Sequence, residues 1–325
     1  MNTLRRKLTA LFSGSMMAVS LCTNAYANDF PSKPIRVIVP YAAGGAGDTL
    51  TRTVSKRMSE ILGQPMIVEN KPGGGGVIGT AEGAKAQADG YTITFVAVPF
   101  IITQSVSAKL PYDGPKDFMP LGLLQLAPLV LVVHPSLNVR TPAEFIRLAK
   151  SRPGQITYAT SGTGSITHMT GEMLEQATGA DIVPIPYQGG GQSIRDLIGG
   201  QVSAAFLSPI EVNQHIASGK IIGIASSTLR RPASMPNIPT FAESGVEGFD
   251  VTGWFAFLVR SGTPADRVAK LSDALQRALQ TPEVRKIIAQ TGEVPEGTTQ
   301  EINELFAREY PRWSRAVKAA NIKPE

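Results

Sequence analysis

The sequence has one cysteine and three histidines among 325 residues, which limits the chemistry available to it. Cys22 lies within an N-terminal apolar run that we expect to be removed, so disulfides and thiol catalysis are both excluded from the mature chain. The histidines lack the His-Glu-x-x-His spacing, and a zinc site would need distant partners. After the N-terminal run, no apolar stretch is long enough to span a bilayer.

The first 27 residues have the features of a secretory signal peptide. Arg5, Arg6 and Lys7 precede an apolar run over residues 8–21. The tripeptide Ala25-Tyr26-Ala27 places small residues three and one before a cut, so we expect cleavage after Ala27 and export of the product. A lipoprotein anchored through Cys22 is the alternative, but a bulky leucine precedes Cys22 where that signal needs a small residue.

Removal of the leader takes away three of the 31 basic residues and none of the 26 acidic ones, which leaves a net charge of +2. No basic stripe with interleaved aromatic residues remains, so nucleic acid is not an expected partner. The mature chain of about 298 residues is long enough for two domains of ordinary size.

Strand-like and helix-like stretches alternate along the mature chain, which predicts an α/β fold. The strand candidates are residues 35–39, 66–69, 92–96, 129–133, 156–159, 182–186, 204–207, 221–225 and 254–259. Apolar residues recur at steps of three and four from Leu50 to Leu62, with Asp48 as the expected N-cap, and again from Val268 to Leu279. These two stripes predict amphipathic helices that bury their apolar faces.

Two strand candidates run into glycine-rich turns that open predicted helices. The turn residues are Ala43, Gly44, Gly45, Gly47 and Asp48 after the first strand, and Ser161, Thr163, Gly164 and Ser165 after residues 156–159. A helix start has unpaired N–H groups and the positive end of the dipole, so such a turn suits an anion. Each turn alone is also typical of an ordinary strand-to-helix connection. Neither has the Gly-Lys-Ser/Thr ending of a phosphate loop, and an exported chain meets few dinucleotides, so a carboxylate is the simpler anion.

An exported serine esterase is an alternative, because Ser161, Ser165 and His168 lie close together in the sequence. Ser165 and His168 are three residues apart on a predicted helix and could touch. However, no Gly-x-Ser-x-Gly elbow surrounds either serine, and no third member of a triad is evident. Serines at helix starts are more often caps or ligand donors, which favours a binding role.

The sequence resembles the Bug family of periplasmic solute receptors, the substrate-binding components of tripartite tricarboxylate transporters. The resemblance covers the mature chain and is carried by Pro34-Ile35-Arg36-Val37-Ile38-Val39-Pro40, Gly44-Gly45 with Asp48, Glu69-Asn70-Lys71-Pro72-Gly73-Gly74, Asp89-Gly90-Tyr91, Tyr158-Ala159-Thr160-Ser161-Gly162 with His168, Pro186-Tyr187-Gln188-Gly189, and Gly253-Trp254-Phe255. It implies a type II periplasmic-binding-protein fold, in which two α/β lobes close on a ligand. Lobe one would hold residues 28–128 and 229–325, and lobe two residues 129–228.

The resemblance also implies a function without chemistry: capture of a carboxylate-bearing small molecule and its delivery to an integral-membrane permease. No cofactor or metal is expected, and the receptor would be a monomer in the periplasm. A receptor that reports to a membrane sensor kinase is the alternative. The expected ligand-binding residues are Ala43, Gly44, Gly45, Gly47, Asp48, Val98, Phe100, Ser161, Thr163, Gly164, Ser165, His168, Gln188, Gly189 and Ser208. Asp48 would repel an anion, so capping is its favoured role.

The chain departs from the family pattern after residues 92–96, where small or polar residues are usual. Here Val98 and Phe100 follow the strand. We hypothesise that Phe100, with Phe206 and Trp254, forms an apolar wall for an aromatic or otherwise bulky carboxylate. The alternative is that these aromatic residues belong to the cores of the lobes.

Overall fold

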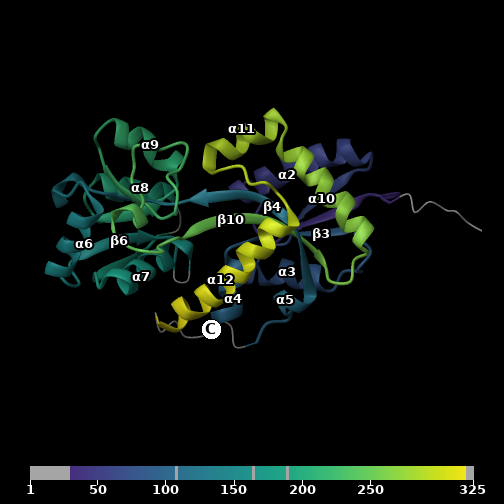
Figure 1. The fold of residues 1–325 in the computed structure, drawn as a ribbon, viewed down its shortest axis with the longest axis horizontal. Coiled ribbons are helices and arrows are strands. Elements are labelled where there is room, and N and C mark those ends of the chain that lie inside the picture. Colours follow the sequence, from purple (N-terminus) through teal and green to yellow (C-terminus); the bar gives the residue numbers. More distant parts are fainter. Residues whose placement is uncertain (1–29, 107–108, 163–164, 188–189, 320–325) are drawn as a thin grey trace, which may run out of the picture.

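The structure is a computed structural model that describes residues 30–106, 109–162, 165–187 and 190–319. Two five-stranded sheets, each flanked by helices, form two lobes that lie side by side (Figure 1). The predicted signal peptide and four expected site residues, Thr163, Gly164, Gln188 and Gly189, lie outside the described residues. In the part of the chain that is described, every helix is too short or too polar to cross a membrane.

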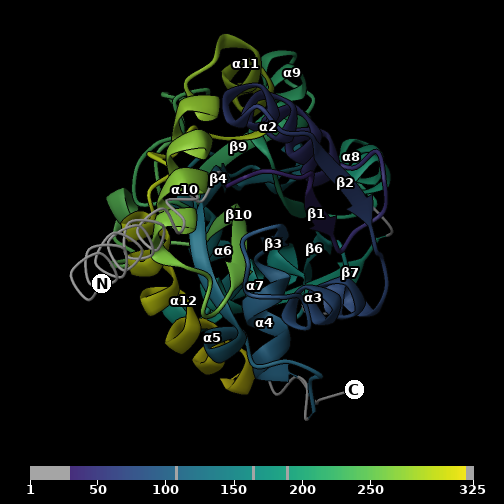
Figure 2. The same cartoon turned by 90° about the vertical axis from the view of Figure 1, so that its right-hand side faces the viewer.

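Lobe one is built on a sheet of strand order β2-β1-β3-β10-β4. Its strands are β1 (Ile35–Val39), β2 (Met66–Asn70), β3 (Thr92–Ala97), β4 (Phe118–Pro128) and β10 (Thr252–Arg260). Its helices are α2 (Ala46–Leu62), η1 (Gly74–Gly76), α3 (Val77–Ala84), α4 (Pro99–Val106), α5 (Gly114–Asp117), α10 (Ala265–Leu279), α11 (Pro282–Thr291) and α12 (Thr299–Ala319). Figure 2 shows α2, α10 and α11 over one face of this sheet and α3, α4 and α12 over the other.

Lobe two is built on a sheet of strand order β7-β6-β8-β5-β9. Its strands are β5 (Val130–Val133), β6 (Ile156–Thr160), β7 (Ile182–Pro186), β8 (Ala204–Leu207) and β9 (Ile222–Ser226). Its helices are η2 (Pro135–Leu137), α6 (Pro142–Ser151), α7 (Ile166–Thr178), α8 (Gly190–Ile198) and α9 (Pro209–Ala217), and η3 (Ala242–Ser244) lies in the connection from β9 to β10.

All nine predicted strands are confirmed to within two residues at either end, but β4 was missed. Its sequence contains Pro120, Gly122 and Pro128, which weaken the pattern of a strand. A proline lacks the N–H that a central strand needs, yet β4 lies at the edge of its sheet, where one side has no strand partner. The prolines therefore made the local sequence unlike that of a strand, whereas the position of β4 at the sheet edge tolerates them.

The two predicted apolar stripes are confirmed as buried helix faces. Leu50, Val54 and Met58 of α2 are at most 1% exposed, and α10 buries Leu271 and Leu275 completely. Burial of each such side chain contributes about 1.5–3 kcal/mol. Both helices therefore hold one face of the lobe-one sheet.

The chain passes between the lobes at two neighbouring points. Leu129 alone joins β4 to β5, and residues 227–251 join β9 to β10. The N–H of Ser227 donates to the carbonyl of Leu129 (2.9 Å), and the N–H of Val251 donates to the carbonyl of Ser227 (2.7 Å). The two crossings are thus hydrogen-bonded to each other, as the adjacent connections of a hinge would be.

The two crossings lie where the edges of the two sheets approach each other, which we call the junction between the lobes. The direction of each strand decides which loops lie at this junction. In lobe one, β4 runs parallel to β1 and β3, because both β3 and β4 are antiparallel to β10. In lobe two, Val130 at the start of β5 pairs with Leu207 at the end of β8, and β6 is parallel to β8. The carboxyl ends of β1, β3, β6 and β8 therefore all lie at the edges where the two sheets approach each other.

The connection between β9 and β10 packs against lobe two over most of its length. Thr240 forms a parallel bridge with Ser226, and the ring of Phe241 lies 6.5 Å from that of Phe206 in β8. The sequence analysis placed residues 229–325 in lobe one, and that boundary stays a prediction. The contacts of Thr240 and Phe241 favour a change of lobe close to Val251.

Candidate functional site

The β1–α2 turn presents the start of a helix at the junction between the lobes. Gly45 is the N-cap of α2, with φ −74° and ψ 169°, and it has no side chain to accept an N–H. The expectation that Asp48 is the N-cap is therefore wrong, because Asp48 already lies in the first turn. The amides of that first turn have no intrahelical acceptor, so they are available to an anion.

The side chain of Asp48 instead fixes the conformation of the β1–α2 turn through three hydrogen bonds. Its carboxylate accepts the N–H of Gly44 (2.9 Å), Nδ2 of Asn70 (2.9 Å) and Nε of Arg52 (3.0 Å), and the residue is only 4% exposed. Burial by itself would raise the pKa of Asp48, but the hydrogen bonds from Arg52, Gly44 and Asn70 outweigh it and hold the pKa below its usual value. The carboxylate is thus ionised at neutral pH, and its bond to the N–H of Gly44 fixes the backbone of the β1–α2 turn.

Close packing explains Gly47 in lobe one, and backbone conformation explains Gly76. A Cβ at Gly47 would lie 2.7 Å from the ring of Phe95 in β3, so no larger residue fits there without a shift. Gly76 has a φ of +104°, which residues with a side chain rarely adopt, and it lies in ordinary contact with Tyr41, whose ring meets Phe95 edge to face. Gly47 was expected at the site, whereas Tyr41 and the glycine segment after β2 were not.

A signal for the missed segment was present in the sequence. Only Lys71 and Pro72 separate β2 from Gly73, Gly74, Gly75 and Gly76, and all four glycines have positive φ angles. Such angles are accessible to glycine and rarely to other residues. Four glycines in a row after a strand at this edge of the sheet therefore indicate a third turn beside the β1–α2 turn.

The β6–α7 turn is the counterpart in lobe two. Ser165 is the N-cap of α7, and its Oγ accepts the N–H of His168 at 3.3 Å. The N–H of Ser161 donates to Oγ1 of Thr167 (2.8 Å), and Ser161 itself is exposed. The hydroxyl of Thr167 thus fixes the beginning of this turn at Ser161, and the hydroxyl of Ser165 fixes its end at the first turn of α7.

The contacts of His168 and Ser165 are those of a packed helix start. His168 is 8% exposed, its Nε2 lies 3.4 Å from Oε1 of Glu172, and its carbonyl accepts the hydroxyl of Tyr158. Ser165 Oγ lies 3.0 Å from Oγ1 of Thr167. The hydroxyl of Ser165 is therefore engaged as a cap, in agreement with the binding interpretation rather than with a nucleophile.

The proposed aromatic wall lies in packed surroundings. Phe100 is 4% exposed, and its ring lies 6.1 Å from Tyr112 in a stacked arrangement and 5.8 Å from Phe118. Phe206 and Trp254 are at most 1% exposed. These contacts favour the core interpretation, and contact of the three rings with a ligand stays a hypothesis.

Val98 and Ser208 follow β3 and β8, so both lie at the edges that face the junction. Val98 is buried, with 3% of its surface exposed. Ser208 precedes α9, and its N–H and hydroxyl both donate to the carboxylate of Glu211. The hydroxyl of Ser208 therefore serves the start of α9, while Val98 belongs to the apolar cluster that also contains Phe100.

Neither turn contributes a formal positive charge. Residues 41–47 and the described residues of the β6–α7 turn contain no lysine or arginine. An anion at these turns would instead be attracted by backbone amides and by the dipoles of α2 and α7, which begin at facing edges of the two sheets. This arrangement suits a small carboxylate held between the lobes.

Comparison with known proteins agrees with this geometry. A sequence model of the family described as "Tripartite tricarboxylate transporter family receptor" matches residues 50–322. The chain is 33% identical over 320 residues to Protein BugT of Bordetella pertussis, which covers 98% of each chain. A solved "periplasmic transporter" is 38% identical with a TM-score of 0.74 and covers 90% of this chain and 99% of its own.

A second solved structure, R. palustris Rpa4515 with adipate, is 30% identical with a TM-score of 0.75. The match covers 91% of this chain and all of that one. The two-lobed fold of this chain is shared with these solved structures, and the matches extend over most of its length. The chain belongs to the tripartite tricarboxylate transporter receptor family, whose members are periplasmic solute-binding proteins and not enzymes.

Proposed function

We propose that the protein captures a carboxylate-bearing metabolite between its lobes and delivers it to the permease of a tripartite tricarboxylate transporter. The observation that carries this proposal is the pair of helix starts, α2 and α7, at facing edges of the two sheets. Unpaired amides there can bind a carboxylate without a buried cationic side chain. The adipate held by the R. palustris relative supports a carboxylate, and a dicarboxylate first of all.

Closure around the ligand would use the paired crossings as its hinge. The bond from the N–H of Ser227 to the carbonyl of Leu129 ties the two connections together, and the bond from Val251 to Ser227 closes the longer connection on itself. A hinge motion of this kind lets the amides of both turns reach the ligand at once and excludes water from it. The closed form would then be what the permease recognises.

We also propose export with cleavage after Ala27. Phe30 is 3% exposed, and its ring meets Tyr91 edge to face at 4.9 Å. Cleavage after Ala27 leaves two residues before this anchored side chain, so the mature chain would start close to the body of lobe one.

A thermal-shift screen of residues 28–325 tests the ligand class. The panel holds adipate and other aliphatic dicarboxylates, tricarboxylates, amino acids, and aromatic mono- and dicarboxylates. Binding to the folded state raises the melting temperature by mass action. We expect a rise with one class of acid and none with its amide analogue; an equal rise with the amide, or no rise with any acid, would overturn carboxylate capture.

Gly47→Ala provides the matched test of the site. The added Cβ would meet Phe95 at 2.7 Å, so the start of α2 must shift, and we expect the affinity for the acid to fall roughly tenfold. Gly199→Ala is the control, because its φ is ordinary and the nearest atom to its Cβ is a carbonyl oxygen at 3.4 Å. Equal affinities of the two variants would place the ligand elsewhere.

A further inference from the structure

The segment after α11 is attached to the edge of lobe one at the junction between the lobes. Glu293 and Leu126 of β4 exchange two backbone hydrogen bonds, of 2.7 and 3.0 Å. A Cβ at the preceding Gly292 would lie 2.1 Å from the carbonyl oxygen of Leu126, so the chain approaches β4 very closely there. The backbone of Glu293 therefore moves with lobe one.

The side chain of Glu293 reaches the other lobe. Its Oε1 accepts the backbone N–H of Ala233 at 3.0 Å. Ala233 is the second residue of a turn in which the N–H of Met235 donates to the carbonyl of Pro232 (2.9 Å). Met235 is 5% exposed and belongs to the core cluster that contains Val130, Leu207 and Val212 of lobe two.

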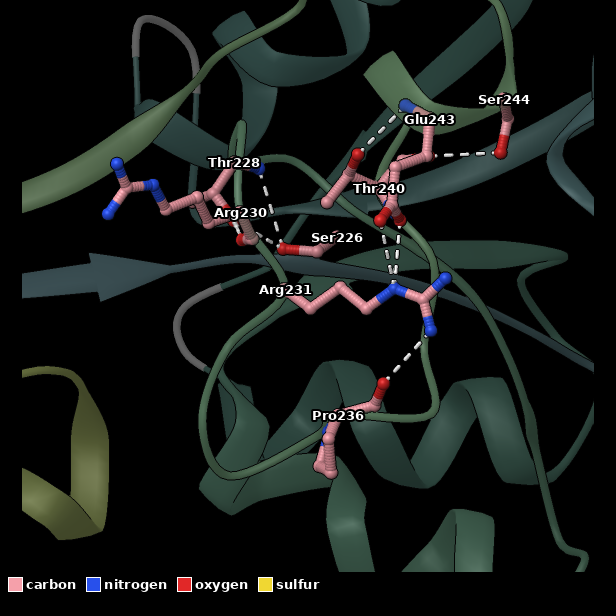
Figure 3. A network of polar contacts seen from close by, with 8 residues as sticks. All are labelled: Ser226, Thr228, Arg230, Arg231, Pro236, Thr240, Glu243 and Ser244. Carbon is pink, nitrogen blue, oxygen red and sulfur yellow. Dashed lines mark hydrogen bonds and ion pairs between the residues drawn. The ribbon is translucent and has the colours of Figure 1, made fainter.

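Ala233 lies in the connection from β9 to β10, and a polar network holds that connection to lobe two (Figure 3). Nε of Arg231 donates to both carboxylate oxygens of Glu243, at 2.9 and 3.1 Å, and its Nη1 donates to the carbonyl of Pro236 at 3.0 Å. Glu243 also accepts the N–H of Thr240 (2.8 Å), and that bond, together with Arg231, lowers its pKa. Since Thr240 pairs with Ser226 of β9, the N–H of Ala233 moves with lobe two.

A hollow of about 270 Å³ lies beside this contact, with walls from both lobes. Its lining includes Ile210 and Asn213 of α9 on one side and Ala289 and Gly292 on the other. The lobes are therefore not packed tightly along this flank. A single hydrogen bond to a charged acceptor has more influence on their arrangement where packing is incomplete.

We infer that Glu293 is a positioning residue for ligand capture, because its carboxylate binds lobe two through Ala233 and holds the two lobes in the arrangement seen here. The inference rests on the proposed function only for its effect on ligand affinity. A hydrogen bond to a charged acceptor is enough to change the ratio of two lobe arrangements roughly tenfold. Its loss should lower the affinity for the ligand by the fraction of molecules that leave the binding arrangement.

The test measures the distance between the lobes with and without adipate. Residues 28–325 contain no cysteine, so Lys220→Cys in lobe two and Lys270→Cys in lobe one, both exposed, accept a pair of spin labels without side reaction. Glu293→Ala removes the acceptor. Ala233→Pro removes the donor at the second position of its turn, which proline favours.

We expect both variants to shift the distance distribution in the same direction and to raise the dissociation constant for adipate roughly tenfold. Glu293→Gln keeps a neutral acceptor and should restore part of the original distribution, so that it lies between the wild type and Glu293→Ala. Glu304→Ala is the matched control, because Glu304 is exposed and bonds to Gln300 of its own helix. An unchanged distribution in Glu293→Ala, or a shift in that variant but not in Ala233→Pro, would overturn the inference. A shift without any adipate binding would support the bond and contradict only the proposed ligand.

Discussion

Replacement of Asp48 by alanine should both destabilise lobe one and weaken ligand binding. The carboxylate holds the N–H of Gly44, the amide of Asn70 and the guanidinium of Arg52, although it is not expected to touch the ligand. The bonds to Gly44 and Asn70 are shielded by burial and contribute about 1 kcal/mol each. Arg52 is half exposed, so its ion pair adds about 0.5 kcal/mol or less.

The whole substitution should therefore cost about 2–3 kcal/mol. For a chain of this size, such a loss lowers the melting temperature by roughly 4–10 °C. The affinity for the acid should fall as well, because the first-turn amides of α2 lose their fixed orientation. Denaturant titration and calorimetric binding measure the two effects separately.

The pH dependence gives an independent check on Asp48. Its folded pKa lies below its unfolded value, so its contribution to stability is present above about pH 4 and is lost as the pH falls through the folded pKa. The difference between the wild type and Asp48→Ala should thus be constant near neutral pH and shrink below pH 4. If Asp48→Ala matched the wild type in both stability and affinity at pH 7, the bracing role would be refuted.

Two further substitutions address the core of lobe one. Phe100→Ala should cost about 3–5 kcal/mol in a denaturant titration because it opens a cavity beside Tyr112 and Phe118; an unchanged ranking of aromatic over aliphatic acids would contradict the aromatic-wall hypothesis. Burial raises the pKa of Glu309 despite the nearby Arg312, so the folded state binds the proton more tightly and this contribution to stability declines as the pH rises above about 4.3. Glu309→Gln should remove that decline as the pH rises above the ordinary glutamate pKa, and a slope equal to that of the wild type would assign the decline to another group.

The strands were well predicted because their signal is local. A buried strand needs only a short apolar run between turn residues, and β1, β7 and β8 match their predicted ranges at both ends. β4 was missed because its prolines are acceptable only at a sheet edge, and the order of strands in a sheet is not encoded within eleven residues. The N-cap of α2 was misplaced for a related reason, since the partner of Asp48, Asn70, lies 22 residues away at the end of β2.

The sequence by itself determined the α/β class, the apolar faces of α2 and α10 and the glycine turns, because helix period, strand run and positive φ depend on neighbouring residues. Its motifs also identified the family. Only the tertiary structure decided which strand ends face the junction, that Phe100 packs among aromatic residues, and that Glu293 meets Ala233 sixty residues away. Those relations depend on strand direction, register and packing between distant segments, and such contacts exist only once the chain has folded.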